Sequence, residues 1–143
     1  MAVLRGLVHP VAGPIVPVIL RQSVAAEEVT AFEAHGYAIV DTGAALSGID
    51  EDIAIRLKLP PVGTLKMSRP GPAPDFTACR FHGEIAFPSN HRFPAFASAL
   101  VGYHGLDTRF GDNIRVVALL GRDWLADVRL SVQGGRDLEI HRI

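Results

Sequence analysis

The chain has 143 residues, of which 48% are apolar and 20% charged, and its fourteen basic and fifteen acidic side chains leave a net charge of −1. This length suits one domain with a substantial core, so we expect a single domain over residues 1–143, with residues 1–13 as an N-terminal extension. The balanced charge gives no basic footprint for nucleic acid or for an anionic membrane surface. The single cysteine, Cys79, excludes an intrachain disulfide and a cysteine-based zinc site.

The apolar stretches near the N-terminus are interrupted by Arg5, His9 and three prolines before residue 18. Neither a secretory signal nor a membrane span has this pattern, so we expect a cytoplasmic protein without a membrane segment. The six histidines show no i, i+4 pair and no other zinc-binding spacing. We therefore expect neither a metal nor a cofactor.

The first half of the chain mixes strands and helices. Residues 14–20 are rich in β-branched side chains and predict a strand, which its prolines place at a sheet edge. Residues 23–35 have apolar side chains at helical spacing, with Ser23 as N-cap and Gly36 as the stop. Residues 37–40 form an apolar run typical of a buried strand. A second helix follows over 49–57, where Ser47 and Asp50 are spaced like a capping box and prolines end the helix.

From residue 63 onward the pattern is that of β-structure. Residues 64–67 and 76–81 flank a proline-rich segment and predict a hairpin with a stiff tip. Further strands are expected at 84–87, 99–103, 116–120, 128–132 and 138–143, with one turn of helix over 121–125. Gly134-Gly135 predicts a tight turn between the last two strands. Many short strands with regular turns indicate a barrel or a sandwich.

Asp41 follows the apolar run 37–40 directly and is followed by Thr42, Gly43 and Ala44. Aspartate is disfavoured in strands, and an unpaired buried carboxylate is costly. Two readings are open for this residue alone: it bonds the N–H groups of its own turn, or it performs chemistry.

Three features taken together resemble the retropepsin-like aspartic peptidases, the retroviral proteases and their cellular and bacterial relatives. The first is Ile39-Val40-Asp41-Thr42-Gly43-Ala44, the second is the hairpin near residue 70, and the third is Leu119-Leu120-Gly121-Arg122-Asp123-Trp124-Leu125. Gly121 lies 80 residues after Asp41. The resemblance extends from about residue 14 to the C-terminus. It implies a mostly β, single-lobe acid-protease fold: a closed β-barrel with a flap hairpin, one or two short helices and a two-fold homodimer.

The resemblance also assigns roles to residues. Asp41, Thr42 and Gly43 would be catalytic, with Asp41 meeting its copy from the second protomer and Thr42 bonding across the two-fold axis. Ala44 and the flap would bind substrate, and Leu120, Gly121 and Arg122 would support the site. The expected flap residues are Met67, Ser68, Arg69, Pro70 and Gly71. By the same resemblance, residues 138–143 would pair with the partner's strand at the dimer interface.

The chain departs from the retroviral pattern at two points. It has Ala45 where those enzymes often carry an aspartate that pairs with the arginine corresponding to Arg122, so Asp50, Asp107 and Asp123 are the acidic alternatives. Prolines replace the glycine pair of the flap tip. The leading hypothesis is an aspartic endopeptidase acting on polypeptides. The alternative is a catalytically silent dimeric module of the same fold that binds peptides or serves as a scaffold.

Overall fold

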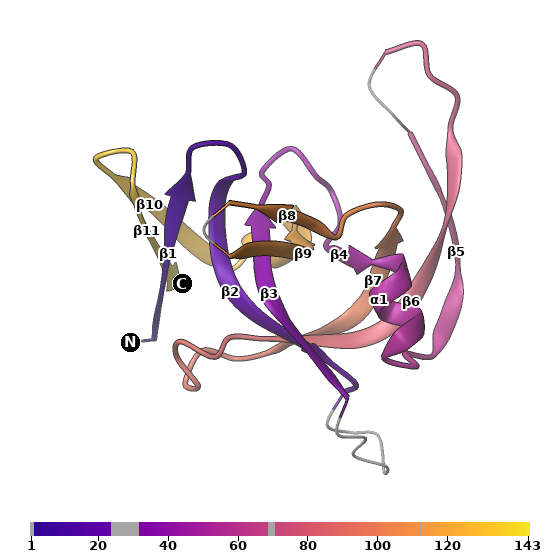
Figure 1. The fold of residues 1–143 in the computed structure, drawn as a ribbon, viewed down its shortest axis with the longest axis horizontal. Helices are drawn as coiled ribbons and strands as arrows, with labels where there is room; N and C mark the ends of the chain where they lie inside the picture. The colour runs from indigo at the N-terminus through magenta and orange to yellow at the C-terminus, as the bar shows by residue number, and fades with distance from the viewer. Residues whose placement is uncertain (1, 24–31, 69–70, 112) are drawn as a thin grey trace.

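The computed structural model describes residues 2–23, 32–68, 71–111 and 113–143. Within these ranges the chain is mostly β, with eleven strands and two short helices (Figure 1). In chain order the elements are β1 (Val3–His9), β2 (Gly13–Arg21), β3 (Glu33–Val40), β4 (Gly48–Asp50), α1 (Glu51–Arg56), β5 (Pro61–Met67), β6 (Phe76–Ala86), β7 (Phe96–Tyr103), β8 (Thr108–Phe110), β9 (Ile114–Leu120), α2 (Arg122–Leu125), β10 (Val128–Gln133) and β11 (Asp137–Arg142).

All strands belong to one sheet with the order β10-β11-β1-β2-β3-β9-β4-β7-β6-β5, and β8 pairs with β9. β2 also pairs with β6, so hydrogen bonding runs in a ring through β2, β3, β9, β4, β7 and β6. β10 and β5 are the two ends of the strand order and lie on opposite sides of the molecule (Figure 1). β3 and β9 run parallel, and this pairing brings the ends of the two predicted motifs together.

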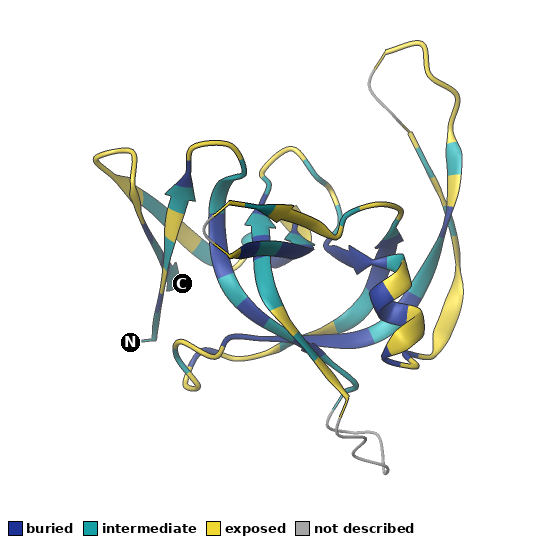
Figure 2. Ribbon diagram, viewed as in Figure 1, coloured by how far each residue is buried: buried dark blue, intermediate teal, exposed yellow. Residues whose placement is uncertain are grey.

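The core lies between these curved strands and is apolar. It is built from side chains such as Val18, Leu20, Ile49, Leu100 and Leu120, none of them more than 1% exposed. In Figure 2 the buried residues follow the strands of the ring, whereas β5 and residues 71–75 of the connection to β6 are largely exposed. Burial of this apolar surface is the main force that stabilises the sheet.

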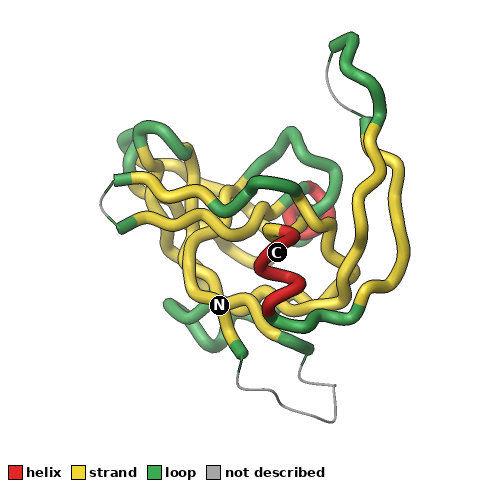
Figure 3. The backbone as a smooth tube through the Cα atoms, turned by 45° about the vertical axis from the view of Figure 1, so that its right-hand side comes forward, coloured by secondary structure: helices red, strands yellow, loops and turns green. Residues whose placement is uncertain are grey.

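The β5–β6 hairpin extends away from the rest of the molecule (Figure 3). Its strands pair in antiparallel register from Pro61 opposite Phe81 to Met67 opposite Phe76, which confirms the predicted hairpin. β6 continues without interruption to Ala86, so the separate strand predicted at 84–87 is the second half of this longer strand. The strands predicted at 99–103, 116–120 and 128–132 and the turn of helix at 121–125 are confirmed as β7, β9, β10 and α2.

The strand predicted over residues 14–20 is confirmed as β2, but the edge position predicted for it is wrong. β2 pairs with β3 along 15–21, with β1 at 13–15 and with β6 at 19–21. Pro17 falls between the last partner from β1 and the first from β6. Proline, which has no N–H, is therefore accommodated in this interior strand. At Pro17 no described strand pairs with the side of β2 that faces away from β3.

The helix predicted over 23–35 is wrong at its end, since Glu33 to Gly36 belong to β3. Gly36 is not a helix stop but a point of close approach: a Cβ atom there would lie 2.7 Å from the carbonyl oxygen of Arg115 in β9. Residues 24–31 of that predicted helix lie outside the described residues. No helix in the described part of the chain has the length and apolarity needed to cross a membrane.

Three strands are absent from the sequence-based prediction. β1 lies within the expected N-terminal extension, and β4 and β8 are three residues each, too short for a period to show. α1 begins later than predicted, because Asp50 rather than Ser47 is its N-cap and accepts a hydrogen bond from the N–H of Ile53 at 3.1 Å. The charge of an acidic first turn also complements the helix dipole.

The C-terminal strand has no free edge. β11 pairs with β1 on one side and with β10 on the other, so the expectation that residues 138–143 pair with a partner's strand is not met. The turn between β10 and β11 is as predicted, because Gly134 and Gly135 have φ values of 61° and 65°, which suit a type I′ turn.

Candidate functional site

Asp41 leaves β3 into a tight turn at the surface. Its N–H donates to the carbonyl oxygen of Leu120 at 2.9 Å, and its carboxylate Oδ1 accepts from the N–H of Gly43 at 2.8 Å. Asp41 is half-buried, whereas Thr42 and Gly43 are exposed. The local turn predicted for this aspartate is therefore present. That turn uses one oxygen of the carboxylate, and no second hydrogen-bond partner for the group occurs among the described residues.

The segment that begins at Gly121 holds the loop after Asp41 through backbone hydrogen bonds. The N–H of Arg122 donates to the carbonyl oxygen of Ala44 at 2.8 Å, and the N–H of Asp123 donates to that of Ala45 at 3.3 Å. A Cβ atom on Gly121 would lie 2.8 Å from the Ala44 oxygen, so a glycine is needed for this approach. Thus the two motifs predicted to cooperate are in direct contact.

A pair formed by the buried Ser47 and the exposed Asp123 completes the support and was not predicted in this role. Ser47, 1% exposed, donates from Oγ to Oδ1 of Asp123 at 2.6 Å and accepts from the N–H of Gly121 at 2.9 Å. Asp123 also accepts from the N–H of Ser47, at 3.0 and 3.1 Å. The sequence suggests other roles for both residues: part of a capping box for Ser47 and an ion pair with Arg122 for Asp123. Only the fold shows that they lie together.

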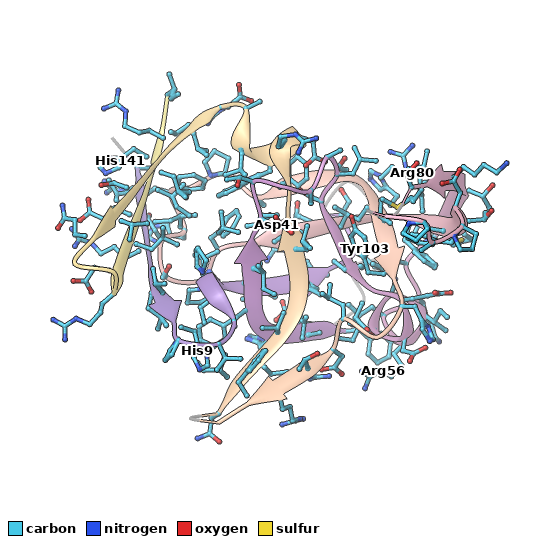
Figure 4. The ribbon with its side chains drawn as sticks, turned by 90° about the horizontal axis from the view of Figure 1, so that it is seen from above. His9, Asp41, Arg56, Arg80, Tyr103 and His141 are labelled. Carbon is cyan, nitrogen blue, oxygen red and sulfur yellow. The ribbon has the colours of Figure 1, made fainter. Side chains whose placement is uncertain are left out.

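Tyr103, at the end of β7, is a further residue of the site that the sequence does not single out. Its hydroxyl donates to the carbonyl oxygen of Leu46 at 2.9 Å, next to the loop that carries Asp41 (Figure 4). Burial raises the pKa of the Tyr103 hydroxyl, and the carboxylates of Asp123 and then Asp41 raise it further. The ring fits against Gly48, where a Cβ atom would lie 2.4 Å from it.

Arg122 does not contact any of the three acidic side chains considered from the sequence. Its Nη1 donates instead to the carbonyl oxygen of Thr42 at 3.1 Å. Asp50 caps α1 and also accepts from the N–H of Asp107, Asp107 binds Arg115, and Asp123 binds Ser47. Arg122 therefore holds the Asp41 turn through its backbone.

The flap residues form a separate group. Met67 ends β5, Ser68 and Gly71 are exposed in the connection to β6, and the predicted flap residues Arg69 and Pro70 lie outside the described residues. Figures 1 and 3 both show the tip of this hairpin clear of the loop that follows β3. The single chain thus does not bring the flap onto Asp41.

Among the described residues, no group of three or more histidine, cysteine or acidic side chains is arranged to hold a metal ion. Comparisons of the chain with family models, curated proteins and solved structures find no match. The resemblance to the retropepsin-like peptidases therefore stays a prediction that rests on the residues of this chain.

Proposed function

We propose that the chain is a single-lobe acid protease with a closed barrel, which hydrolyses peptide bonds as a two-fold homodimer. The observation that carries the proposal is the placement of Asp41. The glycine turn is bonded to Leu120 and Arg122, and Tyr103 binds the carbonyl oxygen of Leu46 just after it. This turn presents the half-buried carboxylate of Asp41 at the surface. One carboxylate cannot both activate water and donate a proton, so the site requires the Asp41 of a second copy.

In the dimer, the two Asp41 carboxyl groups share one proton, because two like charges so close cannot both ionise. The ionised group takes a proton from a water molecule, and the water oxygen attacks the peptide carbonyl carbon. The protonated group donates to the carbonyl oxygen, which gives a tetrahedral diol. Transfer of a proton to the amide nitrogen then breaks the C–N bond. No metal or cofactor takes part in these steps.

The substrate of this site is an extended polypeptide. It would lie between the Asp41 pair and the β5–β6 hairpin, which closes over it and excludes water. The peptide would bind by strand-like main-chain pairing, and its alternate side chains would enter apolar pockets. Ala44, whose N–H donates to the carbonyl oxygen of Asp41, would contact this peptide.

The test is cleavage of a peptide library at acidic and neutral pH by the wild type and by Asp41→Asn. Asp52→Asn is the matched control, because Asp52 is an exposed aspartate in the first turn of α1. We expect cleavage by the wild type and by the control, and none by Asp41→Asn. Equal cleavage by all three proteins, or cleavage by none, would overturn the peptidase proposal.

One observation favours the alternative of a catalytically silent peptide-binding or scaffolding dimer. Arg122 contacts a backbone oxygen, and no carboxylate pairs with it among the described residues. The alternative predicts that the wild type retains library peptides intact. Mass spectrometry of the bound fraction separates the two cases, since the peptidase yields shortened peptides and the silent module yields peptides of full length.

A further inference from the structure

β10 is an end of the strand order, and its outer side has no strand partner in the described part of the chain. We propose that two copies of this chain join edge to edge through β10 in antiparallel pairing, so that β11 and β1 extend the shared sheet on each side. This inference rests on the proposed function, which needs a second copy to complete the Asp41 pair. It replaces the C-terminal strand as the interface, because both edges of β11 are used within the chain.

β10 is better suited to this pairing than β5, the other end of the order. β5 begins with a proline, and its register with β6 shifts between Pro61 and Gly63, where Gly63 has a φ of 138°. Prolines and irregularities of this kind protect an edge from strand addition. β10 contains no proline or glycine, and all six of its residues pair with β11 in unbroken register.

β10 is also continuous with the support of the site. It begins at Val128, with two residues between it and the end of α2, whose first residues Arg122 and Asp123 hold the Asp41 loop. A two-fold axis that passes beside β10 and beside Asp41 would place each β10 next to its copy and each Asp41 next to its copy. In this arrangement the strand that joins the subunits is linked through one helical turn to the turn that carries the carboxylate.

The side chains of β10 limit how two copies can pair. Val128, Leu130 and Val132 alternate with Arg129, Ser131 and Gln133, so the two sets face opposite sides of the sheet. Directly opposite residues in an antiparallel pair share a face, so a two-fold axis must pass by a single residue that faces its own copy. An axis at Arg129 would oppose two like charges, which is destabilising.

Axes at Leu130 or at Ser131 give the longest overlap, five residues of each strand. With the axis at Leu130, Arg129 faces Ser131 of the second copy, and Val128 faces Val132. With the axis at Ser131, Arg129 faces Gln133, and Leu130 faces Val132. Both arrangements keep the arginines apart and cover Val132, which is 49% exposed in the single chain.

The test places single cysteines along the strand in a Cys79→Ser background. Directly opposite Cα atoms in an antiparallel pair are about 4.5 to 5.5 Å apart, within the range of a disulfide. We expect Leu130→Cys or Ser131→Cys to form a disulfide-linked dimer under mild oxidation, and the linked protein to keep its cleavage activity. Val132→Cys on the same strand and Thr64→Cys, exposed on β5, should stay unlinked.

The outcomes separate this inference from the proposed function. A wild type that is dimeric and cleaves peptides, but whose Leu130→Cys and Ser131→Cys variants stay unlinked, overturns the β10 interface and leaves the peptidase standing. Linked dimers that do not cleave peptides support the interface while the peptidase proposal fails. As a measurement free of substitutions, amide exchange in the wild type should show β10 amides that become protected with rising protein concentration. Unchanged exchange across concentrations at which the protein dimerises contradicts the interface.

Discussion

The turn that carries Asp41 is held by residues that lie far from it in sequence. Leu120 accepts its N–H, Arg122 donates to the carbonyl oxygens of Thr42 and Ala44, and Tyr103 reaches Leu46. Each bond fixes the backbone rather than the carboxylate. The carboxylate thus keeps an oxygen for a ligand while its position is set by the fold. Such preorganisation is what a catalytic group needs.

At Ser47 we predict a loss of stability. Ser47→Ala removes both the donor to Asp123 and the acceptor of the Gly121 N–H, and it leaves a buried N–H without a partner. The cost should be about 1 to 3 kcal/mol of unfolding free energy, measured by urea denaturation. Ser89→Ala, at an exposed loop serine, should change it by less than about 0.5 kcal/mol. Equal midpoints for both variants would contradict the role given to Ser47.

Tyr103 provides a measurable report on Asp41. The Asp41 carboxylate contributes to the raised pKa of Tyr103, so Asp41→Asn should lower that pKa because it removes a negative charge. The remaining causes, burial and Asp123, still keep the pKa above its ordinary value. Absorbance titration in a Tyr37→Phe background isolates the signal, since the chain has two tyrosines. Asp52→Asn is the control, and an equal shift in that variant would show that Asp41 does not act on Tyr103 directly.

The Asp107–Arg115 pair should make stability depend on pH. The hydrogen bonds from Arg115, at 2.8 Å to each oxygen, are the main cause that lowers the pKa of Asp107. A lowered pKa in the folded state gives stability that is present above the unfolded pKa, about 4, and is lost as pH falls through the folded value. Asp107→Asn should cost less than about 1 kcal/mol at pH 7, because the pair is partly exposed. The difference from the wild type should shrink as the pH is lowered below about 4, and a gap constant with pH would refute this assignment.

Among the elements, those with a strong local pattern are the ones the sequence predicts. The β5–β6 hairpin and the Gly134-Gly135 turn depend on residues next to each other and are confirmed. β4 has no such local pattern. A glycine is needed at position 48 because Val101 and Tyr103 on β7 leave no room for a Cβ atom. The edge position predicted for β2 is wrong for the same reason, because β6, which pairs with its residues 19–21, comes from a distant part of the chain. In the site, the contact of the two motifs could be predicted, whereas Ser47 and Tyr103 required the fold.

The packing of β4 against β7 yields a prediction about Gly48. A Cβ atom at this position would lie 2.3 Å from the carbonyl oxygen of Val101, and backbone cannot move aside as a flexible side chain can. We expect Gly48→Ala to destabilise the protein by about 1 to 3 kcal/mol or to prevent folding, measured by thermal unfolding. Gly111→Ala, where a Cβ atom meets nothing within 4 Å, is the control and should leave the melting temperature nearly unchanged. A similar effect of the two substitutions would contradict the close approach.

For the molecule as a whole, the ring of strands and the two ends of the sheet have different tasks in the proposed enzyme. The ring encloses the core and fixes the Asp41 loop. β5, with its irregular edge, belongs to the hairpin that covers substrate, and β10, with its regular edge, joins the second copy. A monomer would then be folded and yet inactive, because each chain holds half of the catalytic pair.

Mixing experiments test this division directly. If the active unit needs an Asp41 from each of two copies, heterodimers of wild type and Asp41→Asn are inactive. At fixed total concentration and after subunit exchange, the cleavage rate should then fall as the square of the wild-type fraction. A site complete in one chain would give a linear fall, because every wild-type chain would stay active whatever its partner. Mixing with Asp52→Asn, which keeps Asp41, should leave the rate unchanged at every ratio. A linear decrease with Asp41→Asn would overturn the shared site, while the folded chain and its Asp41 turn would remain as described.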